Sequence, residues 1–352
     1  MNETLKIVTV VGARPQLVKA AALAAAAREE ARVEDVVIHT GQHFDASMSD
    51  VFFAELDITP PRHHLGISGG GHGEMTGRMM TALEPVIEAE RPNIVVVYGD
   101  TNSTVAAALV AAKLHVPVCH VEAGLRSFNR RMPEEINRVV TDHVSSLLFC
   151  PTTVAVDNLA REGVTRGVHH VGDVMYDVAL RAAERARGTR TIVGDLGLRD
   201  GEYAVATVHR AENTESEEAL RQVVDYLRRE ASTRPVVLPL HPRTKAAAER
   251  WGLSFGPVTV IPPVGFLDMT RLLMGAALAL TDSGGVQKEA YFHGVPCVTM
   301  RGETEWVETI QCGWNRLWTD EAYAPRRPIT DYGDGHAAAR ILEILQRANE
   351  EQ

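Results

Sequence analysis

Short apolar, β-branched runs alternate along most of the chain with alanine- and leucine-rich stretches of helical period. In the first half the strand-like runs are KIVTVVG, EDVVIHTG, NIVVVYGD, VPVCHVEAG and LLFCP. Strands that are apolar almost throughout, and that alternate with helices, are typical of a parallel sheet covered on both faces. The pattern therefore predicts an α/β fold.

The alternation weakens over residues 176–202, a polar stretch with several glycines, and then resumes with YAVATV, RPVVLPL, VTVIPP, AALALT and PCVTM. We interpret the break as the join between two doubly wound, Rossmann-like domains. The predicted domains are residues 1–172 and 173–334. The last helix, within residues 335–352, is a candidate to pack back onto the N-terminal domain.

Composition narrows the class of protein. Of 352 residues, 45% are apolar and 23% are charged, as in soluble enzymes, and the formal net charge is −10. Such an acidic chain lacks the basic face that a general nucleic-acid or membrane-surface binder needs. No apolar run reaches the roughly 18 residues of a membrane span, and the first residues lack a signal-peptide pattern. With no C-x-x-C pair, the four cysteines are expected to be free thiols in a reducing cytoplasm.

The turn TDSGGVQKEA follows an apolar run and precedes an expected helix. Ligands of doubly wound sheets bind beyond the carboxyl ends of the strands, so such turns are candidate sites. Gly284 and Gly285 allow a ligand close to the backbone, Ser283 supplies a hydroxyl, and the first helix amides favour phosphate. Glu289 follows one to two turns later, where its carboxylate can accept hydrogen bonds from ribose. The alternative is an ordinary turn with Ser283 as helix N-cap.

The first turn, GARPQLVK, follows the same logic. Pro15 suits the start of a helix, and Arg14 and Lys19 can reach over the ends of the strands. An arginine can hold a diphosphate through two parallel hydrogen bonds. A solvated Arg and Lys at a helix start is the alternative, but two cations at the mouth of the first strand favour an anion site.

Three carboxylates stand at strand ends or at the start of a helix: Asp100 in YGDTNST, Glu122 in HVEAGLRS and Glu134 in PEEINR. A carboxylate that ends an apolar strand is half-buried, so its pKa is open to tuning. We predict that the three converge as a general acid–base set. The alternatives are ordinary helix caps after Asp100 and a surface i,i+4 ion pair from Glu134 to Arg138, worth about 0.3–0.5 kcal/mol.

Two histidines follow strands and stand beside an arginine: His209 in TVHRAEN, and His241 with Arg243 in PLHPRTK. A lone histidine is more often structural, but this arrangement suggests anion contacts. Other histidines occur in pairs, yet no H-E-x-x-H or thiolate set exists, so no metal is expected. The stretch SGGGHGEM, residues 68–75, is interpreted as a mobile loop, and the chain has no P-loop motif of an ATPase.

Together these turns resemble those of the non-hydrolysing UDP-N-acetylglucosamine 2-epimerases. The matching pieces run in the family's order across nearly the whole chain: GARPQLVK, HTGQHFD, YGDTNSTVAAALVA, HVEAGLRS, PEEINR, VGDVMYD, TVHRAEN, TDSGGVQKEA and GVPCVTMR. Each piece alone is weak, but the ordered set is specific. The resemblance implies a GT-B-like pair of domains with the active site in the cleft between them.

The resemblance also implies roles. Diphosphate would be held by Arg14, His209, Ser283 and Gly284, and ribose by Glu289. Proton transfer would fall to Asp100, Glu122 and Glu134, with His209 in the same catalytic set and Arg138 beside it. Substrate binding would be supported by Lys19, Arg126, His241, Arg243 and Gly285.

The implied reaction is elimination of UDP from C1 as the C2 proton is removed, followed by re-addition to the other face of a 2-acetamidoglucal. It needs no cofactor and no metal. Domain closure would keep water away from the intermediate. The expected partner is a UDP-sugar, and the family is usually homodimeric.

Some positions depart from the family. Ala13 and Gln16 replace the Thr and Glu of G-T-R-P-E, and Trp306 replaces the Arg of TERPE. Gln42 and His43 of the bacterial allosteric pocket are kept, but Gly70 stands near the position of a glutamine that this pocket uses. We therefore expect catalysis to be retained and allosteric activation by a second UDP-GlcNAc to be weakened.

Four other functions stay open at this stage. A hydrolysing epimerase would release N-acetylmannosamine and free UDP from the same residues. An epimerase of a modified UDP-HexNAc, with a C3 acetamido group or a C6 carboxylate, would use the same nucleotide clamp. A GT-B glycosyltransferase would need an acceptor site, and a binding protein would not need the three carboxylates.

Overall fold

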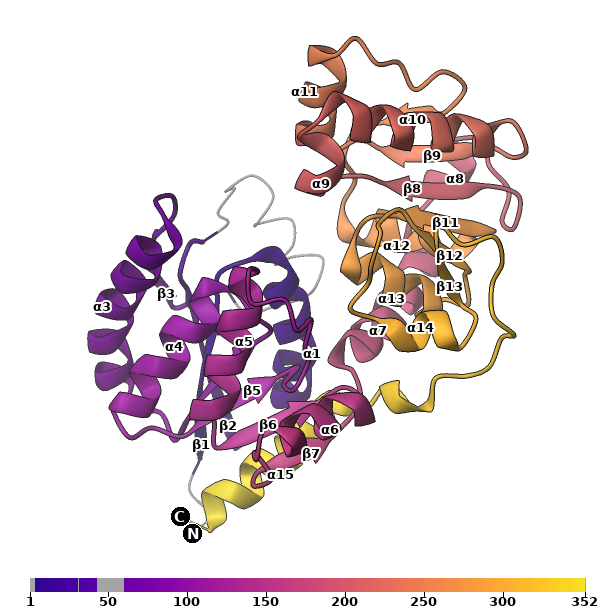
Figure 1. Cartoon of the computed structure of the whole chain (residues 1–352). Helices are drawn as coiled ribbons and strands as arrows, with labels where there is room; N and C mark the ends of the chain where they lie inside the picture. The colour runs from indigo at the N-terminus through magenta and orange to yellow at the C-terminus, as the bar shows by residue number, and fades with distance from the viewer. Residues whose placement is uncertain (1–3, 31, 43–59, 352) are drawn as a thin grey trace. The chain divides into compact units, whose positions relative to one another are not determined.

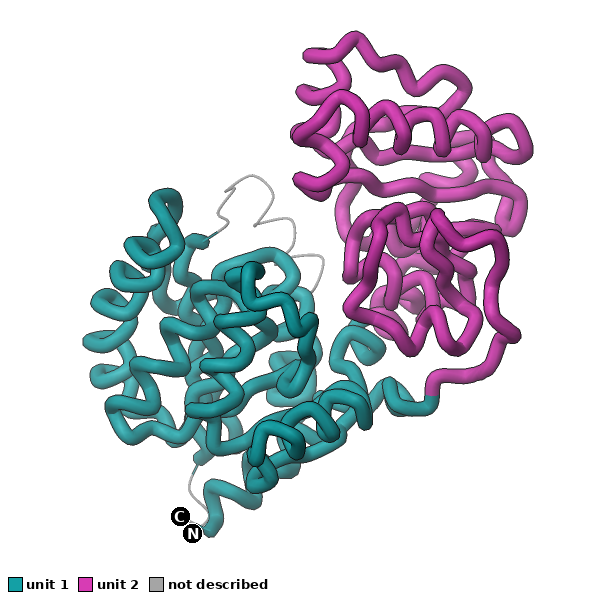
Figure 2. Tube along the Cα trace, in the orientation of Figure 1, with its two compact units in different colours: residues 1–178, 330–352 teal, residues 179–329 magenta. Residues whose placement is uncertain are grey.

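The computed structural model describes residues 4–30, 32–42 and 60–351, which form two compact units (Figure 1, Figure 2). Unit 1 comprises Met1–Val178 and Thr330–Gln352, and unit 2 comprises Ala179–Ile329. These borders fall six residues after the first predicted border, 172/173, and five residues before the second, 334/335. Helix α7 (Val174–Thr189) contains the first border.

Unit 1 is built on a parallel sheet with the strand order β3-β2-β1-β4-β5-β6-β7. Its strands are β1 (Leu5–Val11), β2 (Val33–His39), β3 (His63–His64), β4 (Ile94–Tyr98), β5 (Val118–Val121), β6 (Leu147–Cys150) and β7 (Val168–His170). Its helices, besides α7, are α1 (Arg14–Glu29), α3 (His72–Glu90), α4 (Asn102–Lys113), α5 (Pro133–Val144), α6 (Thr153–Arg161) and α15 (Ala337–Glu350), with a 3-10 turn η1 (Thr330–Tyr332).

The core of unit 1 follows from the alternation of side chains along the strands. One face of β1, β2 and β4 presents Val and Ile side chains to the apolar stripes of α3 and α4. Helix α1 contacts the same strands, and most of its alanines are buried, which allows a close approach of helix and sheet. The last helix, α15, packs against α1 and so belongs to unit 1.

Unit 2 repeats the architecture with the strand order β10-β9-β8-β11-β12-β13. Its strands are β8 (Ala204–Thr207), β9 (Val236–Pro239), β10 (Thr259–Ile261), β11 (Leu278–Thr281), β12 (Cys297–Thr299) and β13 (Asn315–Leu317). Its helices are α8 (Ile192–Asp195), α9 (Ala211–Thr214), α10 (Glu217–Ala231), α11 (Pro242–Arg250), α12 (Phe266–Gly275), α13 (Gly284–Phe292) and α14 (Val307–Gln311). Separate apolar clusters, one with α10 and α11 and one with α8, α12 and α13, cover the sheet.

The predicted α/β class and the two Rossmann-like sheets are confirmed. The loop interpretation of residues 68–75 is wrong in part, because α3 begins at His72 with Gly71 as its N-cap. Within the described part of the chain, no helix is both long and apolar enough to cross a membrane.

The strand order places the candidate residues. In each sheet the chain order reverses next to the first strand, so β1 lies beside β4 in unit 1 and β8 lies beside β11 in unit 2. Such a reversal separates the loops that follow the two strands and leaves room for a ligand at their carboxyl ends. GARPQLVK and YGDTNST follow one such pair, and TVHRAEN and TDSGGVQKEA follow the other.

Candidate active site

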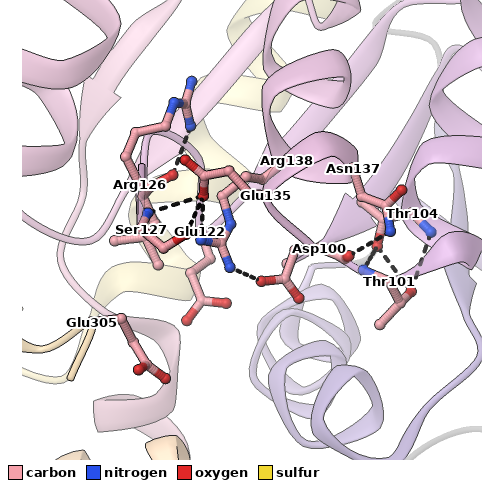
Figure 3. Close-up of polar contacts among 12 residues, drawn as sticks. Asp100, Thr101, Thr104, Glu122, Arg126, Ser127, Glu135, Asn137, Arg138 and Glu305 are labelled. Carbon is pink, nitrogen blue, oxygen red and sulfur yellow. Dashed lines mark hydrogen bonds and ion pairs between the residues drawn. The ribbon is translucent and has the colours of Figure 1, made fainter. Parts of the chain in front are cut away.

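The turn after β4 presents Asp100 to an arginine from α5. A terminal nitrogen of Arg138 bonds Asp100 Oδ2, and the other terminal nitrogen donates to Glu135 Oε2 at 2.8 Å (Figure 3). The Arg138 side chain is 10% exposed and that of Asp100 is 34% exposed. Burial alone would lower the pKa of Arg138, but Asp100, Glu135 and Glu122 raise it, so the guanidinium stays charged.

Glu122 lies beside the same cation, in the first position after β5. Its backbone has φ 73°, a left-handed conformation that is uncommon for a residue other than glycine. Its Oε2 bonds the ammonium of Lys19 from α1, and both side chains are largely buried. Unit 1 therefore brings together Asp100, Glu122, Lys19 and Arg138, four of the residues singled out in the sequence.

Glu134 differs from the adjacent Glu135 in its exposure and its contacts. It is exposed in the first turn of α5, and the described residues give it no hydrogen bond or ion pair. The alternative of an i,i+4 pair with Arg138 is wrong, because Arg138 bonds Glu135, three residues away, and Asp100. Glu135 also accepts hydrogen bonds from the Ser127 amide, the Ser127 hydroxyl and the Phe128 amide, each at 2.9 Å.

Arg126 is held within the protein. Its guanidinium forms two 2.7 Å bonds to Glu162 and one of 2.7 Å to Asp142, and the side chain is 1% exposed. Burial alone would lower the pKa of Arg126, but these two carboxylates raise it. A contact with substrate therefore remains a prediction, and its observed partners give Arg126 a role in holding the loop after β5.

The remaining predicted cation of unit 1 is Arg14, and the predicted allosteric pair is Gln42 and His43. Arg14 is exposed as the first residue of α1. Gln42 Oε1 accepts hydrogen bonds from the Ser103 amide at 3.0 Å and the Ser103 hydroxyl at 2.8 Å, which ties it to the start of α4. His43 lies outside the described residues, so an allosteric role for this pair stays a prediction.

The turn after β11 in unit 2 presents open helix amides. Ser283 occupies the N-cap position of α13, as the alternative interpretation expected, but its side chain makes no capping hydrogen bond. A Cβ on Gly284 would lie 2.4 Å from Glu305 Oε1, which explains the glycine by close approach. Glu305 bonds Arg301 at 2.9 Å and lies 3.8 Å from Arg210, so this helix end collects arginines around a carboxylate. The surroundings favour negative charge.

His209, in the turn after β8, is oriented by the carboxylate that ends β11. Asp282 is fully buried and lies 3.0 Å from His209 Nδ1, and it accepts hydrogen bonds from the amides of His209 and Arg210. Burial alone would raise the pKa of Asp282, but His209 and the backbone amides lower it. Because Nδ1 is bonded to Asp282, Nε2 is the ring nitrogen left to face a ligand.

The remaining residues of unit 2 also lie near strand ends. His241 caps α11, its Nδ1 accepting from the Arg243 amide at 3.2 Å, and its ring centroid lies 5.8 Å from that of His209. Arg243 is exposed, and Glu289 is half-buried in α13. Trp306, at the position of the family's arginine, stacks on Lys288, whose Nζ lies 3.8 Å from the ring centroid.

Several residues of the site were missed in the sequence. Gln16 bridges the first two turns: it accepts from the amides of Gly12 and Ala13 and donates to the Tyr98 carbonyl at 2.8 Å. Asp282 and Glu135 were quoted in motifs without a role. The cap of α4 is Thr101, which accepts from the Thr104 amide at 3.3 Å. Of these residues, only Asp282 could have been identified from the sequence, because it is a charged residue at the end of an apolar strand.

The fold and these two groups of residues define an α/β enzyme of GT-B-like architecture. A family model described as UDP-N-acetylglucosamine 2-epimerase matches residues 25–346. A relative from Pseudomonas aeruginosa, described as a UDP-2,3-diacetamido-2,3-dideoxy-D-glucuronate 2-epimerase, is 51% identical over 363 residues, covering 97% of this chain and 100% of the relative. The chain belongs to the UDP-N-acetylglucosamine 2-epimerase family, and is thus an isomerase.

Two further comparisons come from Methanocaldococcus jannaschii. A UDP-N-acetylglucosamine 2-epimerase from that organism is 39% identical over 363 residues, covering 97% of this chain and 99% of the relative. A crystal structure of its UDP-GlcNAc 2-epimerase in complex with UDP-GlcNAc and UDP matches with a TM-score of 0.88 and 39% identity, covering 97% of this chain and 100% of that one.

Proposed function

We propose that this protein inverts C2 of a UDP-2-acetamido-2-deoxyhexose by eliminating UDP and adding it back. The observation that carries the proposal is the convergence of Asp100 and Glu122 on one buried arginine, Arg138, in a chain of the epimerase family. Two carboxylates held beside one fixed cation suit paired proton transfers, because each stands at a defined position from which it can give or take a proton.

The chemistry explains why an elimination is required. The C2 proton of the sugar is not α to a carbonyl, so its removal alone would leave an unstabilised carbanion. Loss of the C1–O bond as the proton leaves gives a 2-acetamidoglucal and UDP, with the electron pair of the C–H bond forming the C1–C2 double bond. Protonation of C2 from the other face and re-formation of the C1–O bond give the epimer, so atoms and charge balance without a further reactant.

The residues divide into two tasks in this proposal. In unit 2, the α13 amides with Ser283 and Gly284, and His209 through Nε2, hold the diphosphate and stabilise its charge as it leaves. Glu289 of α13 accepts hydrogen bonds from ribose. In unit 1, Asp100 and Glu122 exchange protons with the sugar, and exposed Glu134 is the third carboxylate for that task.

The identity of the sugar is the finer part of the proposal. The relative named for a 2,3-diacetamido glucuronate shares 51% of residues with this chain, against 39% for the M. jannaschii relative named for UDP-N-acetylglucosamine. We therefore favour a UDP-sugar with a second acetamido group at C3 and a carboxylate at C6. UDP-N-acetylglucosamine, converted to UDP-N-acetylmannosamine, is the second candidate, supported by the TM-score of 0.88 to an enzyme complexed with it.

The test is proton NMR of the purified protein with each UDP-sugar in turn. New anomeric signals of the manno epimer are expected, with a higher kcat/KM for the diacetamido glucuronate. Preference for UDP-N-acetylglucosamine would reverse the assignment of the sugar. Free UDP growing in step with a released sugar would indicate hydrolysis, and no conversion of either sugar would contradict the proposed function.

A further inference from the structure

A buried histidine outside the group of candidate residues bonds at both ring nitrogens. His120 of β5 is fully buried. Its Nε2 lies 2.7 Å from the Gly99 carbonyl oxygen, and its Nδ1 lies 2.6 Å from Asp142 Oδ1 in α5. A carbonyl oxygen only accepts, so Nε2 donates to Gly99.

The second bond fixes the other proton of the ring. Burial alone would raise the pKa of Asp142, but His120 and Arg126 lower it, so the group is a carboxylate at neutral pH. A carboxylate also only accepts, so Nδ1 faces Asp142 as a donor in this geometry. Both ring nitrogens of the buried histidine are thus committed to hydrogen bonds.

Asp142 links this pair to the loop that carries Glu122. Its Oδ2 accepts from the Gly124 amide at 3.2 Å and from Arg126 at 2.7 Å. His120 stands two residues before Glu122 and Gly124 stands two residues after it. Asp142 therefore holds the chain on both sides of a candidate proton-transfer residue.

The Gly99 carbonyl belongs to the turn that carries Asp100. Gly99 has φ +62°, and a Cβ there would lie 3.2 Å from Lys19 Nζ and 3.4 Å from Glu122 Oε2. The flanking carbonyls are bonded as well: Gln16 donates to Tyr98 at 2.8 Å, and Asn137 donates to Asp100 at 2.9 Å (Figure 3). Three successive carbonyls of this turn are thus fixed by side chains from α1, β5 and α5.

We propose that His120, held by Asp142, is a positioning residue that sets the Asp100 turn against Glu122. The proposal rests on the proposed function, since it needs Asp100 and Glu122 to exchange protons with the sugar. Through one rigid ring that is hydrogen-bonded at both nitrogens, movement of the backbone at Asp100 is coupled to movement of the backbone at Glu122. A displacement of about 1 Å at a reacting group can cost about 100-fold in rate, so loss of this link lowers turnover.

The test compares His120→Asn with Glu162→Gln in steady-state epimerisation. Glu162 bonds Arg126 at the edge remote from Asp142, so Glu162→Gln disturbs the same ion network without touching His120 or Gly99. We expect His120→Asn to lower kcat about 10- to 100-fold with KM changed less than about threefold. Glu162→Gln is expected to keep kcat, even if its melting temperature falls.

The partition of deuterium between substrate and product distinguishes a loss of positioning from general damage to the fold. With the reaction run in D₂O, we expect His120→Asn to change the ratio of C2 deuterium in recovered substrate to that in product, because the two faces of the intermediate are served by different carboxylates. Glu162→Gln should leave that ratio as in the wild type. Equal kcat and an equal ratio in His120→Asn and the wild type would overturn the proposal.

If His120→Asn does not fold, the wild type still decides. Nitrogen-15 NMR of histidine-labelled protein should show one buried histidine with both ring nitrogens in hydrogen bonds, and this signal should be absent from the spectrum of His120→Gln. Absence of a histidine with two hydrogen-bonded ring nitrogens from the wild-type spectrum would overturn the proposal. If the wild type epimerises neither sugar, the proposed function and the positioning role fail together. If the wild type is active and His120→Asn equals it, only the positioning role fails.

Discussion

Asp282 is a residue whose contacts stabilise unit 2 and orient the ring of His209. It is fully buried and accepts from the amides of His209 and Arg210 and from the Asn213 side chain at 3.1 Å. All these partners are donors, so the site suits a carboxylate and not an amide.

Asp282→Asn should therefore lower the free energy of unfolding, by about 1–3 kcal/mol, because the new NH₂ group faces donors. The native pKa of Asp282 lies below its ordinary value, so its stabilisation is present above the unfolded pKa and is lost as pH falls through the native one. Urea unfolding from pH 3 to 8 checks both points. Asp225→Asn, at a side chain that is 51% exposed, is the control and should stay within about 0.5 kcal/mol. An Asp282→Asn variant as stable as the wild type would contradict this account.

Glu289 should matter for binding more than for chemistry. We expect Glu289→Ala to raise KM for the UDP-sugar more than it lowers kcat, because ribose contacts are equal in the ground and transition states. Steady-state kinetics with the preferred sugar measures both constants. Glu249→Ala, at a side chain of α11 that is 67% exposed, is the control and should change neither constant. A fall in kcat with unchanged KM would contradict a ribose role.

The residues that sequence patterns identified are those that end strands and carry charge. Asp100 and Glu122 stand out because a carboxylate interrupts an apolar run at the end of a strand. His120 did not stand out, since its meaning depends on a carbonyl 21 positions earlier and a carboxylate 22 positions later. Such pairings depend on which faces of β5 and α5 meet, and a linear pattern does not contain that information.

At the scale of elements, β2 carries an unusual acid. Asp35 lies within this strand, and one of its carboxylate oxygens is buried without a hydrogen-bond partner among the described residues. Burial raises the pKa of Asp35 to about 6. A pKa raised in the folded state means that its contribution to stability is present below the unfolded pKa, near 4, and is lost as pH rises through about 6.

Asp35→Asn should remove this pH dependence. The difference in unfolding free energy between Asp35→Asn and the wild type should move in favour of the variant as pH rises from 4 to 7, by about 2–3 kcal/mol. Urea unfolding at four pH values measures it. Glu34→Gln, at a neighbouring side chain that is 42% exposed, is the control and should show a flat difference. A flat difference for Asp35→Asn as well would contradict the raised pKa.

The central apolar strands were predictable and the short edge strands were not. β1, β4 and β11 are apolar runs of seven, five and four residues that are buried almost throughout, and runs of that length are too short for a typical helix. β3 is two histidines and β13 begins with Asn315, so neither has an apolar run to detect. Their pairing depends on a neighbouring strand that is already in place, which only the folded sheet supplies.

At the scale of the whole molecule, each unit has its own sheet and core, and under the proposed function the candidate residues of the two units have different tasks. The chain is acidic, with a net charge of −10, yet cations follow two strands of unit 2: His209 and Arg210 after β8, and Arg301 after β12. Both arginines lie within 4 Å of Glu305, the carboxylate beside Gly284 at the start of α13. Local cations, not overall charge, thus suit an anionic nucleotide.

UDP alone should therefore protect unit 2 most. In hydrogen–deuterium exchange with UDP, the largest protection is expected in peptides covering residues 207–214 and 281–289. Uridine without phosphate is the control and should protect these peptides less. Largest protection confined to unit 1 would contradict the assignment of the diphosphate to α13 and His209.

The most direct measurement of the central claim is solvent deuterium at C2. The preferred UDP-sugar is converted in D₂O and both sugars are recovered and examined by proton NMR. Elimination and re-addition predict deuterium at C2 of the product from the first turnover, and at C2 of the recovered substrate as equilibrium is approached. Epimerisation with the C2 proton retained would contradict the account.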